Sequence, residues 1–366
     1  MIRLVESRVY SISPGTAMQL RNRMICTRAR LIVVGTLALV LLWLSSSSLL
    51  RLYYLLRLPF VWKASSADAI ISQQHDDFDV TFADYDANYS TYATGIRPYI
   101  PRRIHHIHLG ASSPPKNWLD ARAECLKHHE FWEAHLWTDD NADSFVRDNY
   151  PHLYDMWTSY PFNVQRVDAL RYMILQKYGG AILDFDLACK RSLEPLRRFE
   201  FVAPAAHPAG FSIGMMLAAP NNPFVHALVE NLPVYNQVWP LLPYATVMFS
   251  TGCHYASTIF TLQSNRTNLR ILAGPPEQPK MHMLNGVVNT PLFRHFGSSS
   301  WHGHDARLIQ FFKDLDQRIL FAGLVLVLGS TALIILLCIS RRRAPKADDE
   351  ERRLPSFAIK WMTKIA

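Results

Sequence analysis

The chain has 366 residues, of which 49% are hydrophobic and 19% charged, and a formal net charge of +8 at pH 7. Such a length allows one large domain or two average ones. Residues 1–30 carry six Arg and one Glu, and residues 341–366 carry eight Lys or Arg and four Asp or Glu, so the segment between these tails has a net charge of −1. The basic pI therefore reports two tails and is no sign of a nucleic-acid-binding surface.

Two apolar segments lie next to these basic tails. Residues 31–50 and 319–340 contain no charged side chain, and each is long enough to cross a bilayer as a helix. A helix buried in a protein core is the alternative for each segment. Because positive charge favours the cytoplasmic side, the pattern predicts two transmembrane helices, a cytoplasmic tail at 1–30, another at 341–366, and a lumenal segment between the spans.

The segment between the predicted spans contains features that fit a secretory lumen. Asn88-Tyr89-Ser90 and Asn265-Arg266-Thr267 are acceptor sequences for N-glycosylation. Three cysteines fall in this segment, which allows at most one internal disulfide and leaves one thiol over. The sequence does not determine which two cysteines pair; the three are Cys125, Cys189 and Cys253.

The lumenal segment begins with an interfacial segment and stem at 51–96. Residues 51–62 are basic, aromatic and apolar, and they either extend the first span or lie in the membrane interface. Residues 64–95 are polar and lack a clear period. From residue 97, strand and helix patterns alternate, which predicts an α/β domain with a mostly parallel sheet at 97–310. The expected elements are strands at 102–110, 131–141 and 181–187, helices at 117–130 and 162–180, and helical pieces at 142–157 broken at Pro151.

Two aspartates, Asp184 and Asp186, end the most strand-like and apolar run of the domain. Ligands of open α/β sheets bind at the carboxyl ends of strands, and strand alternation would place both carboxylates on one side with Phe185 opposite. Two such oxygen ligands suit Mg²⁺ or Mn²⁺, whose remaining ligands are usually water and phosphate oxygens. The alternative is a strand-end pair that caps a neighbouring loop without a metal.

The segment "YPFNVQRVDALRYMILQKYGGAILDFDLACKRSLEPL" at 160–196 resembles the core of the DXD glycosyltransferases, glycosyltransferase family 32 in particular. The segments "IPRRIHHIHLG", "LWTDDN", "LPYATVMFSTGCHYAS" and "FGSSSWHGHDARL" extend the resemblance over residues 97–308. Within the family, the closest similarity is to fungal mannosyl inositol phosphorylceramide synthases. The resemblance implies a GT-A-like nucleotide-sugar-binding domain flanked by the two transmembrane helices.

The same resemblance implies roles for individual residues. Asp184 and Asp186 match the DXD pair as metal ligands, with His302 completing the metal shell. Arg171 would neutralise the charge of the donor diphosphate, and Asp168 would accept hydrogen bonds from sugar or ribose hydroxyls. Trp301 would close over the donor, and the neighbouring His304 and Asp305 are second choices for these late positions.

The implied reaction is the metal-dependent transfer of mannose from GDP-mannose to inositol phosphorylceramide, with retention of the anomeric configuration. The implied cofactor is Mn²⁺ or Mg²⁺, the acceptor is a membrane lipid, and the location is the Golgi membrane with the catalytic domain in the lumen. A regulatory membrane subunit is a further implied partner. Three alternatives stay open: an α-1,6-mannosyltransferase acting on N-glycans, a non-catalytic subunit of a transferase complex, and a metal-dependent phosphohydrolase.

Overall fold

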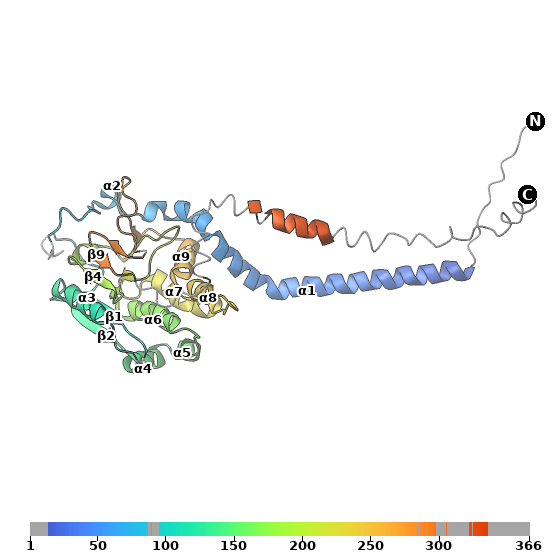
Figure 1. The fold of residues 1–366 in the computed structure, drawn as a ribbon, viewed down its shortest axis with the longest axis horizontal. Coiled ribbons are helices and arrows are strands. Elements are labelled where there is room, and N and C mark those ends of the chain that lie inside the picture. The colour runs from blue at the N-terminus through green and yellow to red at the C-terminus, as the bar shows by residue number, and fades with distance from the viewer. Residues whose placement is uncertain are drawn as a thin grey trace, which may run out of the picture. The chain divides into compact units, whose positions relative to one another are not determined.

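The computed structural model describes residues 14–86, 89, 95–110, 112–284, 286–297, 305, 322–323 and 325–335. The chain divides into two compact units, residues 1–306 and residues 307–366. In the second unit the described residues are helical. The first unit contains the α/β domain, in which helices lie on both faces of a central sheet (Figure 1).

The central sheet has six strands in the order β2-β1-β3-β6-β5-β7. Neighbouring strands pair in parallel between β1 and β2, β1 and β3, and β5 and β7, whereas β6 pairs antiparallel with both β3 and β5. One strand of six is therefore reversed, and the predicted α/β fold with a mostly parallel sheet is confirmed. The strands are β1 (Arg103–Ile107), β2 (Glu133–Trp137), β3 (Gly180–Leu183), β5 (Phe201–Pro204), β6 (Met215–Ala218) and β7 (Leu269–Leu272).

Side chains alternate between the two faces of the sheet and form two apolar cores. On β3, Ile182 contributes to one core, while Ala181 and Leu183 contribute to the other. The first core packs against most helices of the domain. The helices of the domain are α3 (Lys116–Lys127), α4 (Asp139–Asn149), α5 (Pro151–Thr158), α6 (Asn163–Tyr178), α7 (Pro223–Tyr235), α8 (Pro243–Ser250) and α9 (Cys253–Leu262).

The second core is closed by α3 and by a small antiparallel sheet in the order β4-β9-β8. Its strands are β4 (Leu187–Cys189), β8 (Val288–Asn289) and β9 (Phe293–His295). Two predicted boundaries have clear local causes. Pro151 begins α5, where its missing N–H costs no helical hydrogen bond, and Gly179 ends α6 with a φ of 62° that favours glycine.

The stem predicted at 51–96 is instead packed into the domain. Helix α1 (Pro14–Ser66) buries Leu58, and His254 of α9 contacts the carbonyl oxygen of Leu55 at 2.7 Å. After the short helices η1 (Ala67–Ala69) and α2 (Gln73–Asp76), Phe78 and Phe82 are fully buried in the second core. The segment is polar overall, so its few buried apolar side chains gave no recognisable sequence pattern. The domain therefore begins well before residue 97.

None of the helices among the described residues has both the length and the apolar character needed to cross a membrane. The transmembrane helices predicted at 31–50 and 319–340 are therefore not confirmed. Residues 31–50 are part of α1, which continues without a break into the portion that packs on the domain. Residues 319–340 are described only in part.

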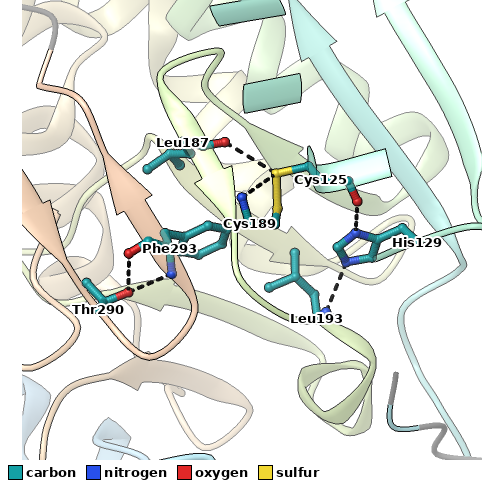
Figure 2. Close-up of a disulfide and its surroundings, with 7 residues drawn as sticks. All are labelled: Cys125, His129, Leu187, Cys189, Leu193, Thr290 and Phe293. Carbon is teal, nitrogen blue, oxygen red and sulfur yellow. Dashed lines mark hydrogen bonds between the residues drawn. A yellow bond between two sulfur atoms is a disulfide. The ribbon is translucent and has the colours of Figure 1, made fainter. Parts of the chain in front are cut away.

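A disulfide joins Cys125 of α3 to Cys189 of β4 (Figure 2). Of the three cysteines between the predicted spans, Cys253 is left as a free thiol. The pairing left open by the sequence is thereby assigned. The backbone N–H of Leu193 donates to His129 Nε2 at 3.0 Å, while His129 Nδ1 lies 2.6 Å from the carbonyl oxygen of Cys125. Burial lowers the pKa of His129 to about 4, so the neutral ring accepts at one nitrogen and donates at the other. The disulfide and this histidine fix β4, the strand that directly follows Asp186.

We predict that the double variant Cys125→Ala/Cys189→Ala has a lower free energy of unfolding by about 4 kcal/mol, because the bridge closes a long loop of the unfolded chain. The two cysteines are 64 residues apart. The measurement is thermal unfolding of the full chain with and without dithiothreitol. Reductant should lower the midpoint of the native chain but not that of the variant, whose only domain thiol is Cys253. Equal midpoints for the two oxidised proteins would contradict the prediction.

Candidate active site

The segment Asp184–Asp186 forms a turn between β3 and β4, at the carboxyl end of β3 in the central sheet. The N–H of Leu187 donates to the carbonyl oxygen of Asp184 at 3.2 Å, which closes this turn. Phe185 is anchored away from solvent, with its ring against those of His106, His108 and Trp118. The predicted alternation along a strand is therefore wrong in detail, because the backbone has already left β3 when the first aspartate is reached.

Asp184 lies between Arg171 and the strand β6. Its Oδ1 accepts a hydrogen bond from Arg171 Nη2 at 2.5 Å, and its backbone N–H donates to the carbonyl oxygen of Gly214 at 2.8 Å. A Cβ atom at position 214 would come within 2.8 Å of Asp184 Oδ2, so only glycine leaves room for this carboxylate. One third of the Asp184 side chain is exposed, and that part faces the cavity described below.

Arg171 is the centre of a buried charge cluster on α6. Its Nη1 donates to the carbonyl oxygen of Ile213 at 3.2 Å and lies 3.4 Å from Asp168 Oδ1. Residues three positions apart share one helix face, which explains how α6 presents both side chains to the same place. Thr251 Oγ1 donates to Asp168 Oδ2 at 3.2 Å. The guanidinium is thus already paired with protein groups, and it holds two carboxylates in fixed orientations.

Asp186 is buried and contacts a residue from a distant part of the chain. Its Oδ2 lies 3.1 Å from His295 Nε2, and its carbonyl oxygen accepts from the N–H of Phe296 at 2.9 Å. His295 reaches this place because β9 pairs antiparallel with β4, with His295 opposite Leu187. The charge of Asp184 also raises the pKa of His295, so both carboxylates of the DXD motif favour the protonated form of this imidazole.

The residues around Asp184 line a cavity of about 130 Å³. Its charged lining residues include Asp168, Arg171 and Asp184, and part of its apolar lining comes from α8. The complete lining is Val164, Asp168, Arg171, Asp184, Leu187, Ser212, Ile213, Gly214, Val247, Met248, Gly252, Cys253, Leu284 and His295.

Burial dominates the electrostatics of these groups. It raises the pKa of Asp184 to about 7 and the pKa of Asp168 to about 6, although Arg171 opposes both rises. Burial alone would lower the pKa of Arg171, but Asp184 and Asp168 raise it. Burial likewise would lower the pKa of His295, yet its hydrogen bond to Asp186 raises it. The two carboxyl groups that line the cavity, Asp168 and Asp184, therefore bind protons at a higher pH than exposed aspartates do.

The donor set fits a hard divalent cation only with help from other ligands. Asp184 and Asp186 supply the carboxylate oxygens that Mg²⁺ and Mn²⁺ prefer. Within the described part of the chain, no group of three or more His, Cys, Asp or Glu side chains could hold a metal by itself. A cation held here would thus take further ligands from water and from the phosphates of a substrate, as Mg²⁺ commonly does.

The structure brings Asp168, Arg171 and Asp184 together around one cavity, with Asp186 directly behind them. Trp301, His302 and His304, which were predicted for the same site, lie outside the described residues. Asp305 is described and has a different place. It is buried, and its Oδ2 accepts from the N–H groups of Tyr244 and Ala245 at 2.7 and 3.3 Å, which caps the first turn of α8.

Several side chains and backbone groups of the site could not be predicted from the sequence. His295 could have been suspected only by knowing that β9 pairs with β4. Thr251 lies in the segment "FSTGC", which resembled the family but suggested no individual role. Gly214 precedes a strand in an apolar stretch, and only its contact with Asp184 shows why the position is glycine.

The sequence of the chain matches a known class of proteins. Residues 115–202 match the family described as "Glycosyltransferase sugar-binding region containing DXD motif". The chain is also 30% identical over 264 residues to "Inositol phosphoceramide mannosyltransferase 1" of Schizosaccharomyces pombe, covering 70% of this chain and 80% of the relative. The chain therefore belongs to the family of DXD glycosyltransferases, and the resemblance drawn from residues 160–196 is confirmed.

Two further relatives come from Saccharomyces cerevisiae. "Mannosyl phosphorylinositol ceramide synthase SUR1" is 34% identical over 227 residues, which are 60% of this chain and 56% of the relative. "Mannosyl phosphorylinositol ceramide synthase CSH1" is 33% identical over 237 residues, which are 63% of this chain and 60% of the relative. The match thus spans a little over half of each yeast protein. Among solved structures, "PaToxG Glycosyltransferase" is similar with a TM-score of 0.34 and 16% identity over 48% of this chain and 74% of that one.

We predict that Asp168 makes the metal-free protein less stable as the pH rises. Because its pKa is raised to about 6, the folded chain holds a proton that the unfolded chain loses at a pH of about 4. Stability from this group is complete below about pH 4 and is lost as the pH rises to about 6, by at most about 3 kcal/mol. The variant Asp168→Asn lacks this titrating group. The free energy of unfolding of the native chain should therefore fall, relative to that of the variant, as the pH rises over the same range.

The measurement is urea unfolding at a series of pH values with a chelator present, comparing the slopes of the two proteins. The matched control is Asp155→Asn, since Asp155 is exposed on α5 and away from the cavity. Parallel pH profiles for Asp168→Asn and the native chain would show that Asp168 is not held in a proton-binding environment.

Proposed function

We propose that the chain is a metal-dependent retaining mannosyltransferase that transfers mannose from GDP-mannose to inositol phosphorylceramide. The observation that carries the proposal is the placement of Asp184, hydrogen-bonded to Arg171, in the lining of a cavity where β3 ends. The family of the chain and the activities named for its relatives support the donor sugar and the lipid acceptor. The GT-A-like arrangement of the nucleotide site is part of the same proposal.

The chain's own residues would divide the work as follows. Asp184 and Asp186 would hold the cation, which supplies charge neutralisation for the departing diphosphate. Arg171 orients Asp184 and Asp168, so its effect on the diphosphate is transmitted through those carboxylates as well as through its charge. Asp168, fixed by Thr251, presents a hydrogen-bond acceptor to hydroxyl groups of the donor. His295 orients Asp186, as residues behind metal ligands commonly do.

The reaction class also sets a requirement for water. A sugar donor whose bond to phosphate is weakened will react with water unless the site excludes it. Much of the cavity lining is apolar, including Val164, Leu187 and the α8 residues Val247 and Met248. This lining would leave the acceptor hydroxyl as the available nucleophile. The proposed His302 and Trp301 contacts with the metal and the donor remain predictions from the sequence.

We expect purified full-length chain with Mn²⁺ to release GDP from GDP-mannose and to form mannosylated inositol phosphorylceramide in mixed vesicles. Replacing either DXD carboxylate, as Asp184→Ala or Asp186→Ala, should lower the transfer rate by about a thousandfold, because the lost metal charge is worth several kcal/mol in the transition state. Product formation is measured with radiolabelled donor, and a panel of GDP- and UDP-sugars establishes the base and sugar preference.

The matched controls are Asp84→Ala and Asp86→Ala, a second Asp-x-Asp pair whose two residues are exposed and do not line the cavity. They should transfer mannose like the native chain. Undiminished transfer by Asp184→Ala would refute the role of the metal site. A native chain that binds GDP-mannose but transfers nothing, alone or with a regulatory membrane subunit, would favour the non-catalytic alternative. Transfer to a mannose oligosaccharide in place of the lipid would favour the N-glycan enzyme.

We also propose that the α/β domain works in the lumen of the Golgi. The disulfide between Cys125 and Cys189 supports this location, since such bridges persist in oxidising compartments. Asn265 is exposed, and its Oδ1 accepts from the N–H and the hydroxyl of Thr267 at 2.9 and 2.7 Å, so the acceptor sequence lies on the surface.

A lumenal domain should therefore carry a glycan at Asn265. Treatment with an amidase that removes N-glycans is expected to increase the electrophoretic mobility of the native chain. The other acceptor, Asn88, lies outside the described residues, so the variant Asn88→Gln is used as the background. In that background Asn265→Gln should abolish the remaining shift. A chain without any glycan, whose domain is digested by protease added to intact membrane vesicles, would place the domain on the cytoplasmic side.

A further inference from the structure

We propose that residues 236–242, together with Arg51 and Arg57 of α1, form a surface that binds the face of an anionic lipid bilayer. We call this the bilayer surface. It lies beside the helix that forms one wall of the active-site cavity, and so it would hold the site against the membrane from which a lipid acceptor is drawn. Only this last step rests on the proposed function; binding of the bilayer does not.

The loop between α7 and α8 exposes apolar side chains at its tip. Leu241 is 96% exposed and has a φ of 64°, a conformation that leucine rarely adopts. Val238 and Leu242 are exposed beside it, and Trp239 is half-buried. Both the positive φ of Leu241 and the exposure of its apolar side chain to water cost free energy, and such costs are typical of functional positions. Exposed aliphatic side chains next to a tryptophan are typical of segments that enter the interfacial region of a bilayer.

Two arginines of α1 stand beside this loop. Arg51 donates from Nη1 to the carbonyl oxygen of Val234 and from Nη2 to Ser48 Oγ at 2.7 Å. The guanidinium of Arg57 lies over the ring of Tyr54, 4.6 Å from its centre. Neither arginine forms an ion pair with a carboxylate among the residues that the structure describes. Both guanidinium groups therefore keep a positive charge that no carboxylate among the described residues neutralises.

The charge pattern selects a lipid bilayer with negative head groups as the partner. Residues 14–66, which form α1, contain no acidic residue, and neither do residues 231–250. Arginines flanked by tyrosine and tryptophan rings suit the head-group level, where phosphates lie just above the acyl chains. The apolar surface also continues along α1, because Leu49, Leu50 and Leu56 are exposed. A protein partner would more often be met by a surface with both signs of charge.

The bilayer surface is connected to the cavity by a single short helix. The loop runs directly into α8, whose N-terminal turn is capped by Asp305 and whose residues Val247 and Met248 line the cavity. Eight residues of α-helix are about 12 Å long, so a lipid head group at Leu241 would lie within reach of the site. Figure 1 shows α7, α8 and α9 beside the end of α1 that packs on the domain.

The test places a photo-crosslinking amino acid, p-benzoylphenylalanine, at position 241 of the full-length chain. The matched control carries it at position 131, because Phe131 is 83% exposed but is flanked by Glu130 and Glu133. Each protein is illuminated with vesicles of phosphatidylcholine, with or without phosphatidylinositol, and covalent lipid adducts are detected by mass spectrometry. Since the probe reports only its own surroundings, membrane attachment elsewhere in the chain does not produce the signal.

We expect lipid adducts at position 241 and not at 131, with a higher yield on the anionic vesicles. The variants Arg51→Gln and Arg57→Gln should each lower the yield on anionic vesicles by about fivefold, as expected for one cation near an anionic surface. Arg147→Gln is the control, because Arg147 is paired with Asp143 on α4. Equal adducts at 241 and 131, adducts only between protein chains, or no dependence on the arginines would overturn the proposal.

The outcome is independent of whether the chain transfers mannose. A chain that shows the adducts but has no transferase activity would refute the proposed function and leave the bilayer surface standing. If both proposals hold, Leu241→Asp should lower transfer to inositol phosphorylceramide in vesicles by about tenfold or more, since an aspartate is strongly disfavoured at membrane depth. The same variant should leave hydrolysis of GDP-mannose in solution unchanged.

Discussion

The active site depends on one buried arginine. Arg171 is almost completely shielded from water, and it is bound to Asp184, Asp168 and the carbonyl oxygen of Ile213. Burial raises the pKa of both acids, and the charge of Arg171 only partly opposes this rise. Because a metal ion binds the ionised form of a carboxylate, a cation bound here would displace the protons that burial favours.

The topology of the sheet explains why these groups meet. Strand β6 runs antiparallel to β3, so the start of β6 lies next to the end of β3. The residues that precede β6, Ile213 and Gly214, consequently stand beside Asp184. On the other side, β4 pairs with β9 and brings His295 to Asp186. The disulfide between α3 and β4 then fixes the strand that directly follows the turn. The reversed strand β6 thus brings the residues that precede it into contact with the DXD motif.

The sequence predicted the elements and the acidic pair well, because these depend on local patterns. The helical stripe of 162–180, its glycine stop and the break at Pro151 all correspond to observed boundaries. It failed where long-range contacts decide the outcome. The aromatic anchors of residues 64–95 are separated by polar residues, so Phe78 and Phe82 gave no period, although both are fully buried. His295 and Thr251 likewise have no local signal, because their roles arise from pairing with β4 and from contact with α6.

Helix α8 joins the parts of the domain that no sequence pattern connects. Asp305 caps its N-terminal turn, and Thr251, the residue that ends it, donates to Asp168. Ser250 in its last turn is bonded to Gln165 of α6 at 2.6 Å. Through these bonds one short helix links Asp305, the exposed loop before Pro243 and the carboxylate of Asp168. The side chains of α8 that line the cavity, Val247 and Met248, are therefore held in place from both ends of the helix.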